Sequence, residues 1–325
     1  MDGKSFKVPV SFQEVLKAEK VVYQYLKPTQ LIYYGGLSDL IGAEIYIKHE
    51  NHHPGGSFKI RGGVNVMHHL NKAGIKGVIT FSTGNHGISV ATAAKWFGLE
   101  AVVVVPKGNN QVKNQLIKNT GAELIEAGET FDEAAKKVEQ LRQEKNLYYI
   151  HAANEPHLIN GVGTEFLEIS KDLPNINTII LPIGAGSEVA AAVTVLKQLN
   201  PNIDIIAVQA EKSQAAYLSW KNKMVQTSKN KTFAGGFATG TAYELPFQIY
   251  KDSLADFVLL TEVEIKEGIA LALKYTNNLA EGAGAATITA AVKIREKLKG
   301  KKVVLQMSGS NIDLNILKEV TNNYL

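Results

Sequence analysis

The sequence predicts an α/β fold in which mostly parallel sheets are covered by helices. From about residue 77 onward, short runs rich in β-branched residues alternate with longer stretches of helical periodicity. Parallel strands need crossover connections and burial on both faces, and strand–helix alternation supplies both. Glycine clusters recur at the predicted strand–helix junctions, where α/β proteins place their ligands. Such a chain is expected to surround one ligand from several sides.

The predicted elements follow one another closely along the chain. The strands are expected at residues 78–81, 101–105, 123–127, 148–150, 178–182, 203–209, 256–260 and 303–306. The helices are expected at residues 87–97, 110–119, 132–145 and 161–171, and from Ser187 onward. Because a single hydrophobic core stops growing at about 250–300 residues, a chain of 325 residues is expected to divide into two lobes.

Composition excludes several classes of function. The chain has no cysteine, which rules out disulfides, thiolate nucleophiles and cysteine-ligated metal centres. The formal net charge is +4 and both signs are mixed along the helical segments, so no nucleic-acid partner is expected. Residues 1–7 are polar, without a signal core, and no apolar run reaches the membrane-spanning length of about 20 residues. We therefore expect a cytoplasmic protein without a membrane partner.

Lys59 is the candidate for covalent chemistry. It lies within residues 54–62, between glycine turns and apolar neighbours. Partial desolvation there would favour the neutral amine that a Schiff base requires. Most lysines are solvated surface charges, and the segment alone leaves that alternative open.

Two segments are candidate anion sites, each between a predicted strand and a predicted helix. Residues 82–87, Ser-Thr-Gly-Asn-His-Gly, offer hydroxyls, an amide and backbone N–H groups suited to a carboxylate. Residues 184–187, Gly-Ala-Gly-Ser, suit a single phosphate. A dinucleotide fingerprint fails there because Val189 stands where a glycine is needed. Ordinary capping and turn roles are the alternatives for both segments.

Together with Ser308, which follows the last predicted strand, these segments resemble the pyridoxal-phosphate enzymes of fold type II. The resemblance is to the threonine dehydratase and serine racemase branch and covers nearly the whole chain. The matching segments are residues 57–62, 82–87, 184–187, 280–284 and 308–311. The resemblance implies a two-lobed, tryptophan synthase β-like fold. Its large cofactor-binding domain would comprise residues 1–50 and 153–325, and its small mobile domain, with Lys59 and the carboxylate loop, residues 51–152.

The resemblance also implies roles for the matching residues. Lys59 would carry pyridoxal 5'-phosphate and act as a catalytic base, and Ser82 and Thr83 are further catalytic candidates. The implied cofactor-binding residues are Phe58, Lys59, Asn85, Gly184, Ala185, Gly186, Ser187, Glu281 and Ser308. The implied substrate-binding residues are Ser82, Thr83, Gly84, Asn85, His86 and Gly236.

The implied reaction converts a β-hydroxy amino acid, threonine or serine, into a 2-oxo acid and ammonia. A serine at the ring nitrogen disfavours a long-lived carbanion, which favours rapid loss of the β-hydroxyl. Serine racemisation, with Thr83 acting on the opposite face of the substrate from Lys59, is an alternative. A 3-hydroxyaspartate dehydratase and a pyridoxal-phosphate-binding protein without turnover are others. His86 after Asn85 argues against β-replacement, whose enzymes resemble Thr-Ser-Gly-Asn-Thr in this loop.

The chain also departs from the branch it resembles. Glu188 follows the phosphate loop, and we expect its side chain to point outward. Gln209 and Ala215 stand where the carboxylates of a cation site would align, so no metal is expected. His49, His52 and His53 lack a spaced acidic partner and are not expected to bind metal either. The resemblance implies a homodimer. The chain also ends soon after Ser308, so we expect a catabolic enzyme without a regulatory domain.

Overall fold

The computed structural model describes residues 8–128 and 131–325, which form two compact units. Unit 1 comprises residues 8–26 and 59–164, and unit 2 comprises residues 27–58 and 165–325. These bounds differ from those of the predicted lobes, most visibly at helix α1 (Phe12–Val22), which belongs to the unit that contains Lys59. The apolar face of α1 packs against other helices of unit 1. The polar residues 1–7 lie outside the described residues.

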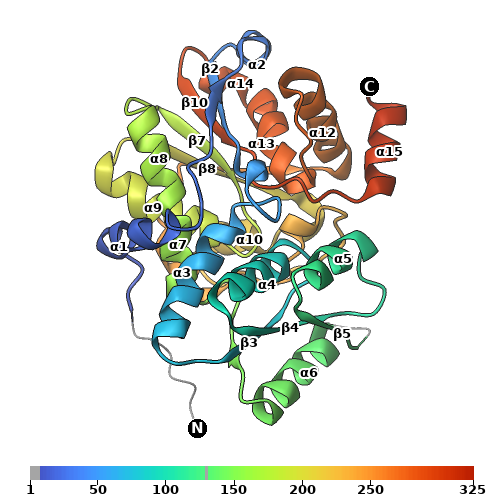
Figure 1. Cartoon of the computed structure of the whole chain (residues 1–325). Helices are drawn as coiled ribbons and strands as arrows, with labels where there is room; N and C mark the ends of the chain where they lie inside the picture. The colour runs from blue at the N-terminus through green and yellow to red at the C-terminus, as the bar shows by residue number, and fades with distance from the viewer. Residues whose placement is uncertain (1–7, 129–130) are drawn as a thin grey trace. The chain divides into compact units, whose positions relative to one another are not determined.

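Unit 1 is built on a four-stranded parallel sheet in the order β5-β4-β3-β6. The strands are β3 (Gly77–Phe81), β4 (Glu100–Val105), β5 (Glu123–Glu126) and β6 (Tyr148–Tyr149). Besides α1, the helices are α3 (Lys59–Lys72), α4 (Asn85–Phe97), α5 (Gln111–Asn119), α6 (Phe131–Glu144) and α7 (Pro156–Val162). Along β4, Val102 and Val104 pack in the cluster with α6, whereas Val103 and Val105 pack in the cluster with α4 and α5. This alternation covers both faces of the sheet (Figure 1).

Unit 2 is built on a six-stranded sheet in the order β1-β2-β10-β7-β8-β9. Only β1 runs antiparallel to its neighbour within this sheet. The strands are β1 (Leu31–Tyr33), β2 (Glu44–Lys48), β7 (Thr178–Pro182), β8 (Asp204–Ala210), β9 (Asp256–Leu260) and β10 (Lys302–Gln306). The helices are α2 (Gly35–Ile41), α8 (Thr164–Asp172), α9 (Ser187–Leu199), α10 (Ala215–Asn222), α11 (Glu244–Tyr250), α12 (Glu262–Thr276), α13 (Gly282–Lys293), α14 (Arg295–Leu298) and α15 (Leu314–Asn323). The short 3-10 helices are η1 (Glu50–His52), η2 (Glu211–Ser213) and η3 (Gly235–Phe237). Figure 1 shows α13 beside β10, and α13 packs against β7 to β10.

The predicted helix over residues 161–171 is in fact two helices, α7 and α8, which meet at Gly163. A β-carbon on Gly163 would lie 2.5 Å from Val15 Cγ2, so only glycine lets α1 approach this closely. This close approach of α1 is a tertiary contact that the helical periodicity does not reveal. Within residues 8–128 and 131–325, every helix is too short or too polar to cross a bilayer.

A stacked pair of histidines joins two helices of unit 1. The rings of His69 on α3 and His157 on α7 have centroids 3.8 Å apart and lie within 17° of parallel. Burial, with a smaller contribution from His69, lowers the pKa of His157 to about 4, and burial also lowers the pKa of His69. Both rings are therefore kept neutral in the folded chain at neutral pH.

We expect His157→Phe to make the stability of the protein less sensitive to acid. Between pH 6.5 and about 4 the unfolded chain binds a proton at His157 that the folded chain does not. As the pH is lowered through this range, the free energy of unfolding should therefore decrease, by at most about 1.4 kcal/mol per pH unit for this residue. Urea denaturation of both proteins at pH 7.5, 6 and 5 measures the slope. Equal slopes for the two proteins would contradict this account.

Candidate active site

The carboxyl ends of three neighbouring strands bring several predicted site segments to one edge of the unit 2 sheet. Strand β10 runs parallel to both β2 and β7, with Gln306 opposite Lys48 in the first pair. The three segments that leave this edge are residues 49–58, 183–187 and 307–311. This is the edge at which open α/β sheets bind ligands.

The segment before Lys59 is paired along its length with the segment after β10. The Phe58 N–H donates to the Ser308 carbonyl at 3.1 Å, and Ser57 forms an antiparallel bridge with Gly309. Asn311 Nδ2 donates to the Gly55 carbonyl at 2.7 Å. Phe58 and Ser308 are both buried, with exposed fractions of 7% and 5%. The position of the chain immediately before Lys59 is thus fixed by the segment that carries Ser308.

Close backbone contacts link the glycine loop to the other predicted residues of unit 2. A β-carbon on Gly184 would lie 2.0 Å from the Gly236 carbonyl oxygen. One on Gly236 would lie 2.6 Å from Ala283 Cβ and 4.0 Å from Glu281 Oε1. The Glu281 N–H in turn donates to the Gly309 carbonyl at 3.0 Å. The structure therefore brings together the glycine loop, Gly236, Glu281 and the residues around Ser308.

Residues 184–187 have the geometry of an anion-binding loop. Gly186 precedes α9 with φ of 91°, a conformation that favours glycine, and Ser187 is the first residue of this 13-residue helix. The first backbone N–H groups of a helix have no partner within the helix, and the helix dipole adds about half a positive charge there. The loop can therefore hold one phosphate group.

The expectation that Glu188 points outward is wrong. Its exposed fraction is 3%, and its neighbours in the first turns of α9 are buried as well. Helix α9 packs against β7 and β8 and also against α11, so its first turn has no solvent-facing side. A buried carboxylate thus lies in the first turn of the helix that begins at the candidate phosphate loop.

A buried polar network supports the start of the segment that leads to Lys59. Lys48 is completely buried, and its Nζ lies 2.6 Å from Glu168 Oε2 and donates to the Thr29 carbonyl at 2.8 Å. Thr29 Oγ1 donates to Glu50 Oε1 at 2.6 Å. The charges of Lys48 and Glu168 compensate each other within unit 2, which is the condition under which buried ions are tolerated, and Glu50 accepts a hydrogen bond from Thr29.

The three histidines before Lys59 bind to separate partners. His49 Nε2 lies 2.8 Å from Tyr34 Oη, and His52 Nε2 lies 2.6 Å from Asn278 Oδ1. His53 Nε2 lies 3.3 Å from Glu50 Oε2. In the described part of the chain, no group of three or more histidine, aspartate or glutamate side chains is arranged to hold a metal ion.

The residues at the predicted position of a cation site form neutral hydrogen bonds. Gln209 Oε1 accepts from the Tyr217 N–H at 3.1 Å. Ser213 Oγ lies 2.8 Å from the Phe237 carbonyl oxygen and 3.0 Å from that of Thr239. Of the two predicted positions, Gln209 is thus an amide in a neutral hydrogen bond and Ala215 has no ligating side chain, so neither supplies a carboxylate.

In unit 1, the structure brings Lys59 next to the predicted carboxylate loop. Lys59 begins α3, and Ser89 Oγ of α4 donates to the Lys59 carbonyl at 2.7 Å. The loop precedes α4, which begins at Asn85, and the Gly84 N–H donates to Ser82 Oγ at 3.2 Å. Burial and then the charge of Lys59 lower the pKa of His86 to about 3. The imidazole of His86 is therefore neutral beside the candidate catalytic lysine.

Two further side chains lie in or next to the loop of residues 82–87, one predicted from the sequence and one not. Thr83 is exposed, so its hydroxyl is accessible from solvent. Lys113, in the first turn of α5, was not among the predicted site residues, yet a β-carbon on Gly84 would lie 3.3 Å from its Nζ. A lysine in the first turn of a helix is electrostatically unfavourable, and this signal could have singled it out.

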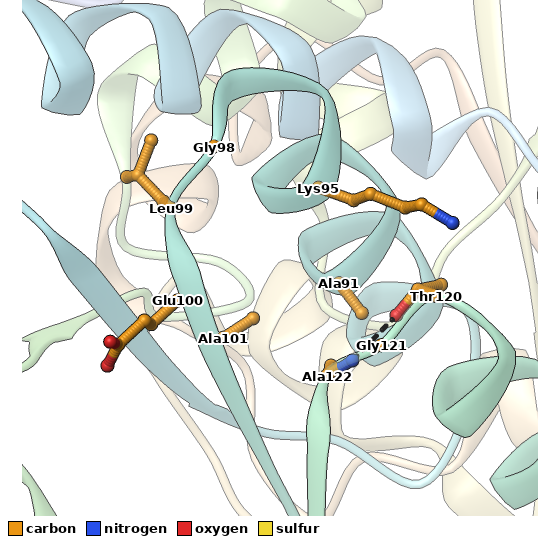
Figure 2. Close-up of a pocket in the computed structure, with 9 residues that line it drawn as sticks. All are labelled: Ala91, Lys95, Gly98, Leu99, Glu100, Ala101, Thr120, Gly121 and Ala122. Carbon is orange, nitrogen blue, oxygen red and sulfur yellow. Dashed lines mark hydrogen bonds between the residues drawn. The ribbon is translucent and has the colours of Figure 1, made fainter.

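A separate pocket of about 290 Å³ lies at the opposite edge of the unit 1 sheet (Figure 2). It is lined near the start of β4 and the ends of α4 and α5, away from the loop before α4. Figure 2 shows Lys95 and Glu100 pointing in different directions, while small residues such as Ala91, Ala101 and Ala122 form much of the lining. None of the predicted site residues lines this pocket.

Comparison with known proteins gives a consistent relationship over almost the whole chain. A family model described as pyridoxal-phosphate dependent enzyme matches residues 22–309. The chain is 35% identical over 318 residues to the L-threonine ammonia-lyase of Thermotoga maritima, covering 97% of this chain and 79% of that protein. It is 34% identical over 322 residues to the catabolic L-threonine dehydratase TdcB of Staphylococcus aureus, covering 97% and 93%.

Solved structures show the same relationship. The structure of maize serine racemase superposes with a TM-score of 0.91 at 25% identity, covering 98% of each chain. The processed threonine deaminase isoform 2 of Solanum lycopersicum gives a TM-score of 0.90 at 31% identity, covering 97% of this chain and 95% of that chain. These matches confirm the predicted α/β fold with two mostly parallel sheets covered by helices, the fold type II class. The chain belongs to the family of pyridoxal-phosphate dependent enzymes.

Proposed function

We propose that this protein is a pyridoxal-phosphate dependent ammonia-lyase that converts L-threonine or L-serine into a 2-oxo acid and ammonia. The observation that carries the proposal is the position of Lys59 beside helix α4, bonded to Ser89 and close enough to His86 of the loop to lower its pKa, in a chain of this family. Support for the substrate class comes from the identity of 35% and 34%, over 97% of the chain, to relatives named as threonine ammonia-lyase and threonine dehydratase.

The residues present fit pyridoxal phosphate. The start of α9 after Gly186 suits the phosphate of the cofactor. A side chain at Gly184 would collide with Gly236, so this position of the loop accepts only glycine. In this proposal Gly184, Ala185, Gly186 and Ser187 hold the phosphate, and Ser308 bonds the ring nitrogen. Asn85 bonds the 3-hydroxyl, Phe58 flanks the ring, and Glu281 lies near it. The bound cofactor supplies an electron sink for charge that develops at the substrate α-carbon.

The chain's own residues then bind the substrate and move its protons. The substrate carboxylate is held by backbone N–H groups of residues 82–86, at the positive end of α4. The Lys59 amine, once neutral, removes the proton from the substrate α-carbon. The His86 imidazole beside that amine is neutral, because burial and then the charge of Lys59 lower its pKa to about 3, so it adds no charge to the substrate site. Loss of the β-hydroxyl and hydrolysis then give the 2-oxo acid and ammonia.

Serine racemisation is a second candidate activity. The similarity to maize serine racemase favours it, together with the accessible hydroxyl of Thr83 in the substrate loop. We rank elimination first because Thr83 carries a methyl group at the position where racemases have a serine. Dehydration of 3-hydroxyaspartate and cofactor binding without turnover are further outcomes of the same assays. A homodimer and a cytoplasmic location stay predictions.

Replacing Lys59 tests the proposed role directly. We expect Lys59→Ala to lose the visible absorption of the lysine-bound cofactor and to lower ammonia release from threonine by about 1,000-fold or more. The matched control is Lys72→Ala, at the exposed end of the same helix α3, which should keep both. Borohydride reduction followed by peptide mass mapping should find a pyridoxyl group at residue 59. A group attached elsewhere, or turnover retained in the variant, would refute the role.

A second prediction concerns the phosphate loop. In Gly184→Ala, the new β-carbon would lie 2.0 Å from the Gly236 oxygen, so the loop must shift. We expect the dissociation constant of pyridoxal phosphate, measured by titration of the apoprotein, to rise about tenfold or more. Gly35→Ala is the control, because its β-carbon would meet only Tyr33 Cε1 at 3.8 Å. An unchanged dissociation constant in Gly184→Ala would show that this loop does not hold the cofactor.

A further inference from the structure

The side chain of Lys113 lies over the loop to which the proposed function assigns the substrate carboxylate. A β-carbon on Gly84 would lie 3.3 Å from Lys113 Nζ and 3.4 Å from its Cδ, so the lysine stem runs along this glycine. Both residues belong to unit 1. Gly84 immediately precedes α4, whose first residue is Asn85. The ammonium group is thus held next to the start of α4.

The backbone that presents Lys113 is well fixed. The Asn110 side chain caps α5 by accepting from the Lys113 N–H at 3.1 Å. The next residue, Asn114, is buried, accepts from Asn109 Nδ2 at 2.6 Å and donates to Glu126 Oε1 at 3.3 Å. The side chain of Lys113 therefore projects from a helix start that is capped and hydrogen-bonded to its surroundings.

The electrostatics of this region favour an anion. Helix N-termini carry a partial positive charge and usually have acidic residues in their first turn. Neither α4 nor α5 has an acidic residue there, and α5 carries Lys113 instead. An ammonium beside two helix starts adds its charge to their partial positive charges, so a carboxylate bound there is attracted by all three.

We infer that Lys113 is a substrate-binding residue whose ammonium pairs with the α-carboxylate of the amino acid held by residues 82–86. This inference rests on the proposed function. Because the paired group is common to all free amino acids, Lys113 selects for a free α-carboxylate and not for a particular side chain. Amides and esters of the same amino acids lack the charge and are bound without its help.

The test compares Lys113→Gln and Lys113→Arg with the matched control Lys118→Gln, an exposed lysine on the same helix α5. The holoenzyme is titrated with L-2-aminobutyrate, which resembles threonine but has no hydroxyl to lose, and binding is followed by the visible spectrum. We expect Lys113→Gln to raise its dissociation constant about tenfold, and to raise the KM for threonine and serine by the same factor. The kcat should change less than about twofold. Lys113→Arg should recover most of the affinity, and Lys118→Gln should match the parent protein.

Two further measurements separate this role from a structural one. The dissociation constant of threoninamide should be equal in the parent and Lys113→Gln proteins. Added salt should reduce the difference between the two proteins in the dissociation constant of 2-aminobutyrate. Equal dissociation constants for 2-aminobutyrate, an equal loss for threoninamide, or no binding of 2-aminobutyrate by the parent protein would overturn the inference. If the parent protein binds 2-aminobutyrate through Lys113 but releases no ammonia from threonine or serine, the proposed function fails and the role of Lys113 stands.

Discussion

The constraint on which the unit 2 site depends is the close approach of backbones at glycine positions. Gly184 leaves no room for a β-carbon against Gly236, and Gly284 leaves none against the Gly309 carbonyl, 2.4 Å from where its β-carbon would lie. These contacts fix the strand and helix ends relative to one another within about an atomic radius. Because Phe58 is paired with Ser308, the same contacts hold the end of the unit 2 segment that precedes Lys59.

Three lysines of the molecule lie in two kinds of local surroundings. Lys48 is completely buried and lies against Glu168, which makes it part of the scaffold. Lys59 and Lys113 instead lie in first helical turns without acidic residues, where the helix dipole opposes a positive charge. That arrangement does not stabilise the fold, but it suits a site for a carbonyl cofactor and an anionic substrate.

The sequence predicted those features that have a local cause. Strands such as β3, β4 and β7 are buried runs of β-branched residues. The loops before α4 and α9 can be recognised by glycine at a predicted strand–helix junction. The features that were missed have distant causes. Gly163 lies against Val15 of α1, and Glu188 is buried in a helix that packs against α11, so both features depend on contacts with distant parts of the sequence. Lys113 was missed because its contact with Gly84 joins segments that are separate in sequence.

The hydrogen bonds of Ser213 show how the turn at residues 235–239 is coupled to the candidate phosphate loop at residues 184–187. A hydroxyl has one proton, yet Ser213 Oγ faces the carbonyls of Phe237 and Thr239 and also accepts from the Thr239 N–H at 3.3 Å. The hydroxyl therefore holds the turn at residues 235–239 through three neutral contacts. Gly236 of this turn packs directly on Gly184, and Thr239 Oγ1 lies 3.4 Å from the Gly184 carbonyl oxygen. A displacement of the turn would consequently move the candidate phosphate loop, so the two cannot adjust independently.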